Sequence, residues 1–375
     1  MSDAGLLVEA AERFGTPLYV TDLDVAAARA RAWQDALPGA LVAYAVKANP
    51  DPALLGRLAA EGIGAEVVGP VELALALRAG VSPERIVVNG VGQTDADLAA
   101  ALDTGALVNA ESLGALAALL AAGDGRVGIR INPGIGAETH PHLATGAATS
   151  KFGIGLDELP EARRMLAAAG RTVTSVGAHI GSDIAGVAPF ARLAELLATC
   201  SRDLDTARVD VGGGFIGPPE ELASVIAAHL PEADRLIVEP GRAIVASAGW
   251  LLTRVVRVQA RGHLIADAGM TELIRPMLYG ARHPVSVLEQ GAASGTRTWT
   301  LSGPICEAGD ILADGVNLAA GEGSLLAIGD VGAYGLAMAS SYNGRLLAAQ
   351  AVIESGSVRL SRRRQTLEDV VARDV

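Results

Sequence analysis

The sequence predicts a (β/α)8 barrel joined to a second, all-β domain of the barrel or sandwich type. Short apolar runs alternate with longer segments of helical period up to about Arg242, as expected for successive βα units. Beyond that point the pattern changes to short β segments with few long helices. The chain has 375 residues, enough for one large domain and a smaller one. We therefore expect the barrel at 25–248 and the β domain at 1–24 plus 249–375.

The elements before the barrel are an amphipathic segment from Leu6 to Phe14 and a strand-like run at 17–21. We expect that first strand to join the β domain. A helical segment follows from Ala26 to Trp33. Eight apolar runs then predict the barrel strands: Leu41–Val46, Ala65–Val68, Ile86–Val88, Leu107–Asn109, Val127–Ile131, Val176–His179, Val209–Val211 and Leu236–Glu239.

The segments between these runs predict helices, among them Ala53–Glu61, Glu72–Gly80, Asp95–Gly105, Leu113–Ala122, Glu158–Ala169 and Pro189–Leu204. The β domain is predicted from the runs Leu251–Ala260, His263–Ala266, Val285–Leu288, Thr296–Leu301, Ser324–Ile328, Gln350–Glu354 and Val358–Ser361. A short charged helix is predicted from Gln365 to Val375.

Composition narrows the possible partners and compartments. The net charge of −12 argues against nucleic acid or an anionic membrane as the main partner. No apolar run approaches the roughly 18 residues of a membrane span, and the N-terminus lacks a basic signal-peptide region. Cys200 and Cys306 are too few for a disulfide framework. We therefore expect a cytoplasmic protein. We also expect no metal site, because His140 and His142 are the only close histidine pair and no cysteine accompanies them.

Most predicted barrel strands end in a polar residue or in glycine. In (β/α)8 barrels the active site is built at the carboxyl ends of the strands, so these residues should gather on one face. They are Lys47, Asn89, Asn109, Asn132, His179, Gly212–Gly214 and Glu239.

Lys47 is distinctive because the chain has only two lysines among its 30 basic residues. A lysine amine can form an imine once burial lowers its pKa, whereas arginine cannot. The alternative is that arginine bias is a genomic habit and that Lys47 survives by chance. The position of Lys47 at the end of a buried strand favours a chemical role.

Three further motifs at strand ends suggest a ligand for this site. The glycines at 212–214 let backbone amides approach an anion, although such runs are also plain turns. The stretch Glu239–Arg242 offers a carboxylate, backbone amides and a guanidinium to a ligand. The alternative is a surface turn with an accidental ion pair. His179 supplies a flat imidazole, or is structural. Together with the Lys47 amine these groups fit pyridoxal phosphate. No dinucleotide or P-loop fingerprint is present.

The sequence resembles the alanine-racemase-fold (fold type III) pyridoxal phosphate decarboxylases, and within them the diaminopimelate decarboxylase-like family. Ten ordered motifs spread over nearly the whole chain carry this resemblance. They are Tyr44–Asn49, Arg130–Gly134, Ser150–Ile154, His179–Ser182, Gly212–Gly214, Glu239–Arg242, Asp267–Met270, Arg275–Tyr279, Cys306–Asp310 and Gly332–Gly335.

The resemblance implies a role for each matching residue. Lys47 would bind the cofactor covalently, His179 would stack on its ring, and Glu239 would keep the pyridine nitrogen protonated. Cys306 would protonate the carbon that loses carbon dioxide. The phosphate would be held by Ser182, Gly213, Gly214, Gly241 and Tyr334. Arg242 would contact cofactor and substrate, and the other substrate-binding residues would be Arg275, Tyr279, Glu307 and Tyr334.

The implied reaction is decarboxylation of meso-diaminopimelate to L-lysine, in a homodimer whose subunits each give Cys306 and Glu307 to the partner's site. Several positions depart from the family pattern. An acidic residue one methylene longer than usual stands at Glu66, and residues 69–71 of the stretch Glu66–Val71 replace the usual serine and glycines. Gln93, Asp183 and Ala308 are also unusual. A decarboxylase for a related diamino acid or an amino-acid conjugate, a racemase and a non-catalytic cofactor carrier remain as alternatives. A racemase is disfavoured because Cys306 with Glu307 does not resemble the racemase's tyrosine. A carrier is disfavoured by the second domain with Cys306, Arg275 and Tyr279.

Overall fold

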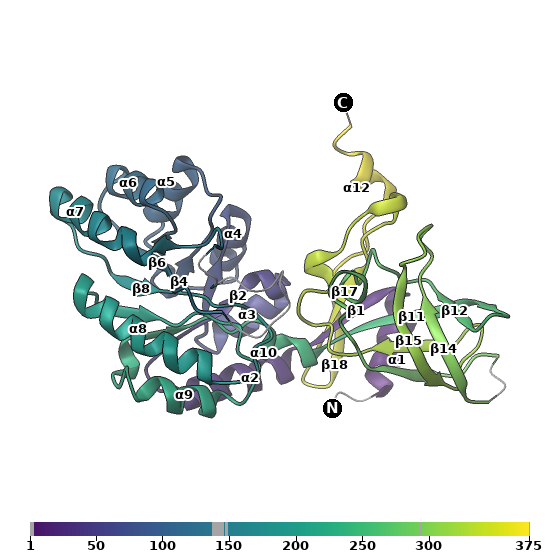
Figure 1. The fold of residues 1–375 in the computed structure, drawn as a ribbon. Helices are drawn as coiled ribbons and strands as arrows, with labels where there is room; N and C mark the ends of the chain where they lie inside the picture. The colour runs from purple at the N-terminus through teal and green to yellow at the C-terminus, as the bar shows by residue number, and fades with distance from the viewer. Residues whose placement is uncertain (1–3, 137–145, 147–148, 293–294, 375) are drawn as a thin grey trace. The chain divides into compact units, whose positions relative to one another are not determined.

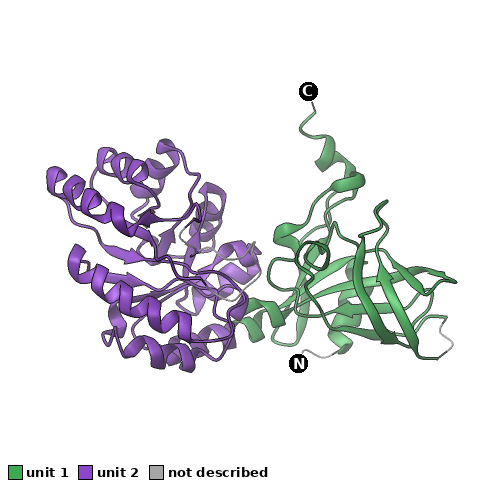
Figure 2. Ribbon diagram, in the orientation of Figure 1, with its two compact units in different colours: residues 1–26, 245–375 green, residues 27–244 purple. Residues whose placement is uncertain are grey.

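The computed structural model describes residues 4–136, 146, 149–292 and 295–374. The chain divides into two compact units, one of residues 27–244 and one of residues 1–26 with 245–375 (Figure 1, Figure 2). His140 and His142 lie outside the described residues. Among the helices that are described, none is both long enough and apolar enough to cross a membrane.

Residues 27–244 contain eight parallel strands that close into a barrel, which confirms the predicted (β/α)8 fold. The strands pair in the order β2-β3-β4-β5-β6-β8-β9-β10, and pairing of β10 with β2 closes the ring. Each strand matches its predicted run to within two residues at either end. The strands are β2 Leu41–Ala45, β3 Gly64–Val67, β4 Ile86–Val88, β5 Leu107–Ala110, β6 Arg126–Asn132, β8 Ser175–Gly177, β9 Arg208–Asp210 and β10 Leu236–Val238.

Helices follow the strands and lie outside them (Figure 1). Each turns an apolar stripe inward; α8, for example, buries Phe190, Leu193 and Leu197. A two-residue strand that the sequence did not predict, β7 (Ile154–Gly155), pairs with the end of β6. The helices are α2 Leu23–Ala36, α3 Pro52–Ala60, α4 Pro70–Arg78, α5 Asp95–Asp103, α6 Leu113–Ala122, α7 Leu159–Ala169, α8 Ala188–Leu204, α9 Pro219–Ala227 and α10 Arg242–Val245.

The interior of the barrel is apolar below the strand ends. Leu41, Ala43, Val87, Leu107 and Ile237 form a fully buried cluster contributed by four of the strands. Branched and small side chains fill such a barrel as a packed core, so it is not a pore. The polar residues of the barrel therefore lie mostly at the carboxyl ends of the strands, although Ser175, at the start of β8, is also buried.

The second unit is mostly β-sheet, with its strands in the order β15-β14-β12-β11-β1-β17-β18 and with β16 pairing β11 and β13. The N-terminal strand joins this unit, as the sequence predicted. It lies between β11, to which it is antiparallel, and β17, to which it is parallel. Its elements are α1 Ala4–Phe14, β1 Leu18–Asp22, β11 Gly249–Gln259, β12 His263–Ala266, α11 Arg275–Tyr279, β13 Val285–Glu289, β14 Arg297–Ser302, β15 Ile311–Leu318, β16 Leu325–Ile328, β17 Ala349–Glu354, β18 Ser357–Arg362 and α12 Leu367–Val371.

Strand β15 was missed in the sequence because Asp314-Gly315 is typical of a turn. In the structure the strand continues through this pair, with Gly315 at a φ of 67°. Irregular register between β14 and β15, at Trp299/Leu301 and Leu301/Ser302, accommodates the left-handed glycine.

Candidate functional site

Lys47 lies in a single 3₁₀ turn, Val46–Ala48, directly after β2. The Tyr44 hydroxyl donates to the carbonyl of Asn49 (3.2 Å), and the Asn49 side chain accepts from the backbone N–H of Asp51 (3.1 Å). Asp51 in turn caps the first turn of α3 through the N–H groups of Ala53 and Leu54. The backbone that carries the lysine is therefore fixed on both sides.

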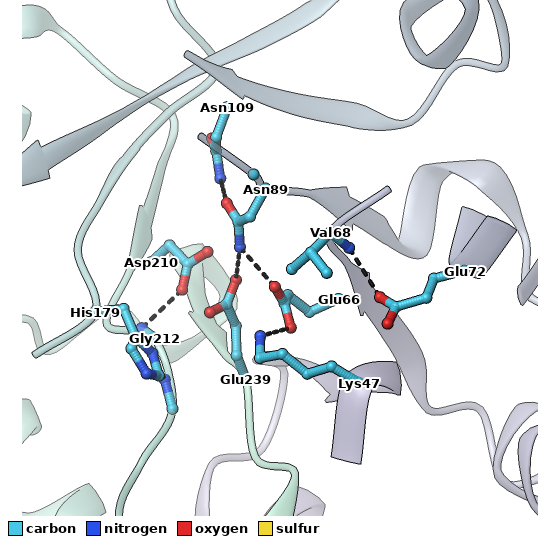
Figure 3. A network of polar contacts seen from close by, with 12 residues as sticks. Lys47, Glu66, Val68, Glu72, Asn89, Asn109, His179, Asp210, Gly212 and Glu239 are labelled. Carbon is cyan, nitrogen blue, oxygen red and sulfur yellow. Dashed lines mark hydrogen bonds and ion pairs between the residues drawn. The ribbon is translucent and has the colours of Figure 1, made fainter. Parts of the chain in front are cut away.

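The Lys47 amine forms an ion pair with the carboxylate of Glu66 on β3 (Figure 3). The lysine side chain is 33% exposed, whereas that of Glu66 is 1% exposed. The amine is therefore held by a buried carboxylate while its other side stays accessible to a ligand.

Two more buried carboxylates, Asp210 on β9 and Glu239 after β10, lie beside this pair (Figure 3). Burial raises the pKa of Glu239 well above its usual range, and the negative charges of Asp210 and Glu66 raise it further. Burial also raises the pKa of Asp210 to about 6. Burial and the neighbouring negative charges therefore both favour the protonated form of Glu239.

These shifts make the stability of the cofactor-free protein depend on pH. Asp210 holds a proton in the folded state up to about pH 6, whereas its usual pKa is 3.8, so the free energy of unfolding falls as the pH rises through this window. We expect Asp210→Asn, which keeps an acceptor for the Gly212 N–H (2.8 Å), to be more stable than the wild type above pH 6. The gain should be on the order of 3 kcal/mol, since the pKa rises from 3.8 to about 6 and one pKa unit corresponds to about 1.4 kcal/mol.

Urea denaturation of the cofactor-free wild type and the variant at pH 4.5 and at pH 8, about 1.5 units below and about 2 units above the folded-state pKa of about 6, would measure this difference. If Asp210→Asn raised the free energy of unfolding equally at both pH values, the gain would not come from the protonation of Asp210, and the raised pKa of Asp210 would be contradicted.

His179 follows β8 and accepts a hydrogen bond from the Gly213 N–H at its Nδ1 (3.1 Å). Desolvation of the ring lowers the pKa of His179 well below its usual value, and the positive charges of Arg130 and Lys47 lower it further. The imidazole is therefore neutral at physiological pH, and its flat face can stack on an aromatic ligand.

The glycine run after β9 packs so tightly that no side chain fits there. A Cβ on Gly213 would collide with the carbonyl oxygen of Glu239, and one on Gly214 with that of Gly181. Gly214 also adopts a φ of 94°, which favours glycine. On the next strand, a Cβ on Gly241 would lie 2.9 Å from that of Ala45. These strand ends therefore present bare backbone, which a phosphate can approach closely.

A cavity of about 480 Å³ opens at the carboxyl ends of the barrel strands, within the barrel unit. This volume lies in the range of small-molecule and cofactor sites. Its lining includes Lys47, Glu66, Asn89, Arg130, His179 and Glu239.

Four residues at this site received no role from the sequence: Glu66, Asn89, Asp210 and Glu111. Glu111 accepts hydrogen bonds from Arg130 (3.0 Å) and from the Gly90 N–H (2.7 Å), and so fixes the arginine in the cavity wall. Asp210 carried a detectable signal, because it is an acid between two valines in a predicted strand. Asn89 was recognised only as a polar strand end.

Two further predicted residues, Ser182 and Arg242, belong to the barrel unit, where the Arg242 guanidinium lies 3.5 Å from the Asp183 carboxylate. The predicted residues of the second unit form two groups there. The Arg275 guanidinium lies 5.3 Å from the ring of Tyr279 and 5.8 Å from that of Tyr334. The Glu307 carboxylate accepts from the Tyr342 hydroxyl (2.7 Å), next to Cys306 in the chain. Cys306 is exposed and therefore accessible for chemistry, whereas Cys200 is buried in α8.

Comparison with known proteins points to one family. The sequence pattern described as "Pyridoxal-dependent decarboxylase, pyridoxal binding domain" matches residues 23–246. Diaminopimelate decarboxylase of Deinococcus radiodurans is 42% identical over 98% of this chain and 98% of its own length. The enzyme of the same name from Aquifex aeolicus is 38% identical over 97% of this chain and 93% of its own.

A solved structure also has a closely similar fold. Diaminopimelate decarboxylase from Helicobacter pylori, in complex with L-lysine, superposes with a TM-score of 0.92 at 33% identity and covers 98% of both chains.

Proposed function

The chain belongs to the diaminopimelate decarboxylase-like family of pyridoxal-dependent decarboxylases, and from this premise we propose that it converts meso-diaminopimelate to L-lysine and carbon dioxide. One observation carries the proposal: a single cavity gathers the Lys47 amine, the neutral His179 ring and the buried Glu239 carboxyl. The names of relatives at 42% and 38% identity, and the L-lysine bound by the Helicobacter pylori enzyme, support the choice of substrate.

The cofactor is pyridoxal 5′-phosphate, and the residues of the cavity fit it. Lys47 would hold it covalently and Glu239 would give its proton to the ring nitrogen, while the bare backbone of Gly213, Gly214 and Gly241 would face the phosphate. Ser182, Tyr334 and Arg242 would add contacts. When bound, this cofactor accepts the electron pair that is left when carbon dioxide departs.

The substrate would be held by side chains that match its charges. Arg242 and Arg275 would bind the retained carboxylate with forked donors, assisted by Tyr279 and Tyr334, and Glu307 would bind the distal ammonium. The Cys306 thiol would then give a proton to the carbon that lost its carboxylate. The C–C bond to the carboxylate is thereby replaced by a C–H bond.

The direct test is carbon dioxide release from meso-diaminopimelate by the cofactor-loaded protein, with L-lysine identified as the product. Rapid turnover is the expected result. If the loaded protein turned over only a related diamino acid or an amino-acid conjugate, the reaction type would stand and the substrate would be wrong. Absence of carbon dioxide from any amino acid would instead indicate a cofactor carrier.

We also propose that the protein acts as a homodimer, with Cys306 and Glu307 entering the partner's site. The exposure of Cys306 supports this proposal. Mixing inactive Lys47→Ala and Cys306→Ala subunits should then restore activity, because half of the random dimers contain one intact site. The expected level is about a quarter of wild type. If mixing after full subunit exchange restored no activity, sharing of the site would be excluded.

Asp183, an unusual residue for this family, should weaken substrate binding. Its carboxylate lies 3.5 Å from the Arg242 guanidinium and competes for it. We expect Asp183→Asn to lower the KM for substrate by about two- to fivefold, the effect of a partly exposed ion pair worth up to about 1 kcal/mol, with kcat unchanged. Steady-state kinetics at two salt concentrations would measure it. If KM were unchanged or raised, we would conclude that Arg242 does not bind the substrate carboxylate.

A further inference from the structure

Asn89 connects two acidic side chains of the site through a single nitrogen atom. Its Nδ2 donates to Glu239 Oε1 at 2.7 Å and to Glu66 Oε1 at 3.1 Å (Figure 3). The other oxygen of Glu66 receives the Lys47 amine. A continuous path of hydrogen bonds therefore runs from Lys47 through Glu66 and Asn89 to Glu239.

The Asn89 amide cannot turn over within this path. Its Oδ1 accepts from the Asn109 amide (2.9 Å), whose own oxygen accepts from the Ser175 hydroxyl (3.4 Å). The Asn89 backbone carbonyl is also bound by the Gln93 side chain (2.6 Å). Asn89 is 5% exposed, so water does not compete for these bonds.

An uncharged double donor suits the charge balance at this point. Acidic side chains outnumber basic ones around it: Glu66, Glu111, Asp210 and Glu239 face Lys47 and Arg130, and His179 is neutral. A cationic donor would compete with Lys47 for Glu66, and an acid would repel both glutamates. An amide satisfies two carboxylates and leaves their charges for Lys47 and for the ligand.

We propose that Asn89 is a positioning residue, which holds Glu66 against Lys47 and Glu239 at the place of the cofactor ring and so couples these two groups. This inference rests on the proposed function, because it takes Lys47 and Glu239 as the cofactor-binding groups. It adds a role that follows from the contacts of this chain, across the barrel from β4 to β10.

The test uses Asn89→Leu, which keeps the branched shape without donors, and Asn89→Asp, which keeps the shape but adds a charge. The pH at which the cofactor's visible absorbance titrates is measured in the loaded protein without substrate, followed by kcat and KM. Without the Asn89 donors, Glu66 and Glu239 bind protons more tightly. The midpoint pH of the absorbance titration should therefore rise by about one unit in the leucine variant. The midpoint pH should rise further in the aspartate variant. In both Asn89 variants kcat should fall about 10- to 100-fold, while KM stays nearly unchanged.

Two further variants separate positioning from packing. Val87→Ala loosens the packing of the same strand within the buried apolar cluster, and it should titrate as the wild type does. Asn109→Ala removes the donor that orients the Asn89 amide but keeps Asn89 itself, so the midpoint pH should rise by a smaller amount. If Asn89→Leu does not fold, the result for Asn109→Ala tests the inference in its place.

A wild-type titration and kcat in Asn89→Leu, or a shift confined to Asn89→Asp, would overturn the inference, because an added charge alone moves nearby titrations. The spectra need no substrate, so these outcomes are independent of whether meso-diaminopimelate is turned over.

Discussion

Lys47→Ala is expected to abolish covalent cofactor binding and to reduce turnover by more than about 1000-fold, since no other group can supply an oriented amine there. Lys47 is placed by a fixed turn at the end of β2 and lines the cavity. Reduction with borohydride, followed by mass analysis of the peptides, should find the cofactor on Lys47 in the wild type and on no residue in the variant.

Lys47→Arg is the matched control for this prediction. Arginine keeps a positive charge beside Glu66 but cannot form an imine. Both variants should lack the trapped cofactor, whereas only the alanine variant leaves Glu66 buried without a cation. A normal trapped adduct in Lys47→Ala would contradict the assignment and would move the attachment to Lys151, the only other lysine of the chain.

Glu239→Gln is expected to lower kcat at least about 100-fold while the cofactor stays attached to Lys47. Glutamine preserves the shape and an acceptor for Asn89, but it carries no proton to give to a ring nitrogen. The variant also removes a buried carboxyl whose pKa is raised, so the cofactor-free protein should become more stable at neutral pH. Kinetics and denaturation on the same preparation measure both effects.

Glu72→Gln provides the comparison for that variant. Glu72 is also an acid whose pKa is raised by burial, but it accepts from the Val68 backbone N–H (2.9 Å) and lies outside the cavity lining. Its kcat should stay within about twofold of the wild type, as expected for a change away from the reacting groups. Equal losses in the two variants would mean that charge in this region, rather than a proton at Glu239, controls the rate.

The sequence was sufficient to predict the barrel and the edge where its site lies. Parallel strands buried on both sides leave continuous apolar runs, so the eight strands were visible without a structure. Lys47, His179 and Glu239 each end such a run, and the closed barrel brings all three into one cavity. These predictions depended only on local pattern and on the geometry of the fold class.

The contacts between the acids could not be predicted in the same way. Asn89 and Glu239 are 150 residues apart and belong to strands separated by β2 and β3 in the ring. Their hydrogen bond depends on strand tilt and stagger, which residue periodicity does not report. Asp210 likewise lies beside Glu239 because of the register of β9 on β10.

The placement of β1 between β11 and β17 has a consequence for the order of folding. Translation proceeds from the N-terminus, and domains generally fold as units as they emerge. The barrel is continuous, so all of its strands are present once residue 244 has been synthesised. Strand β1 is made before any of them, yet its partners begin only at Gly249 and Ala349. One edge of β1 must therefore stay unpaired until β11 has followed the whole barrel, and its other edge until β17 has been synthesised still later.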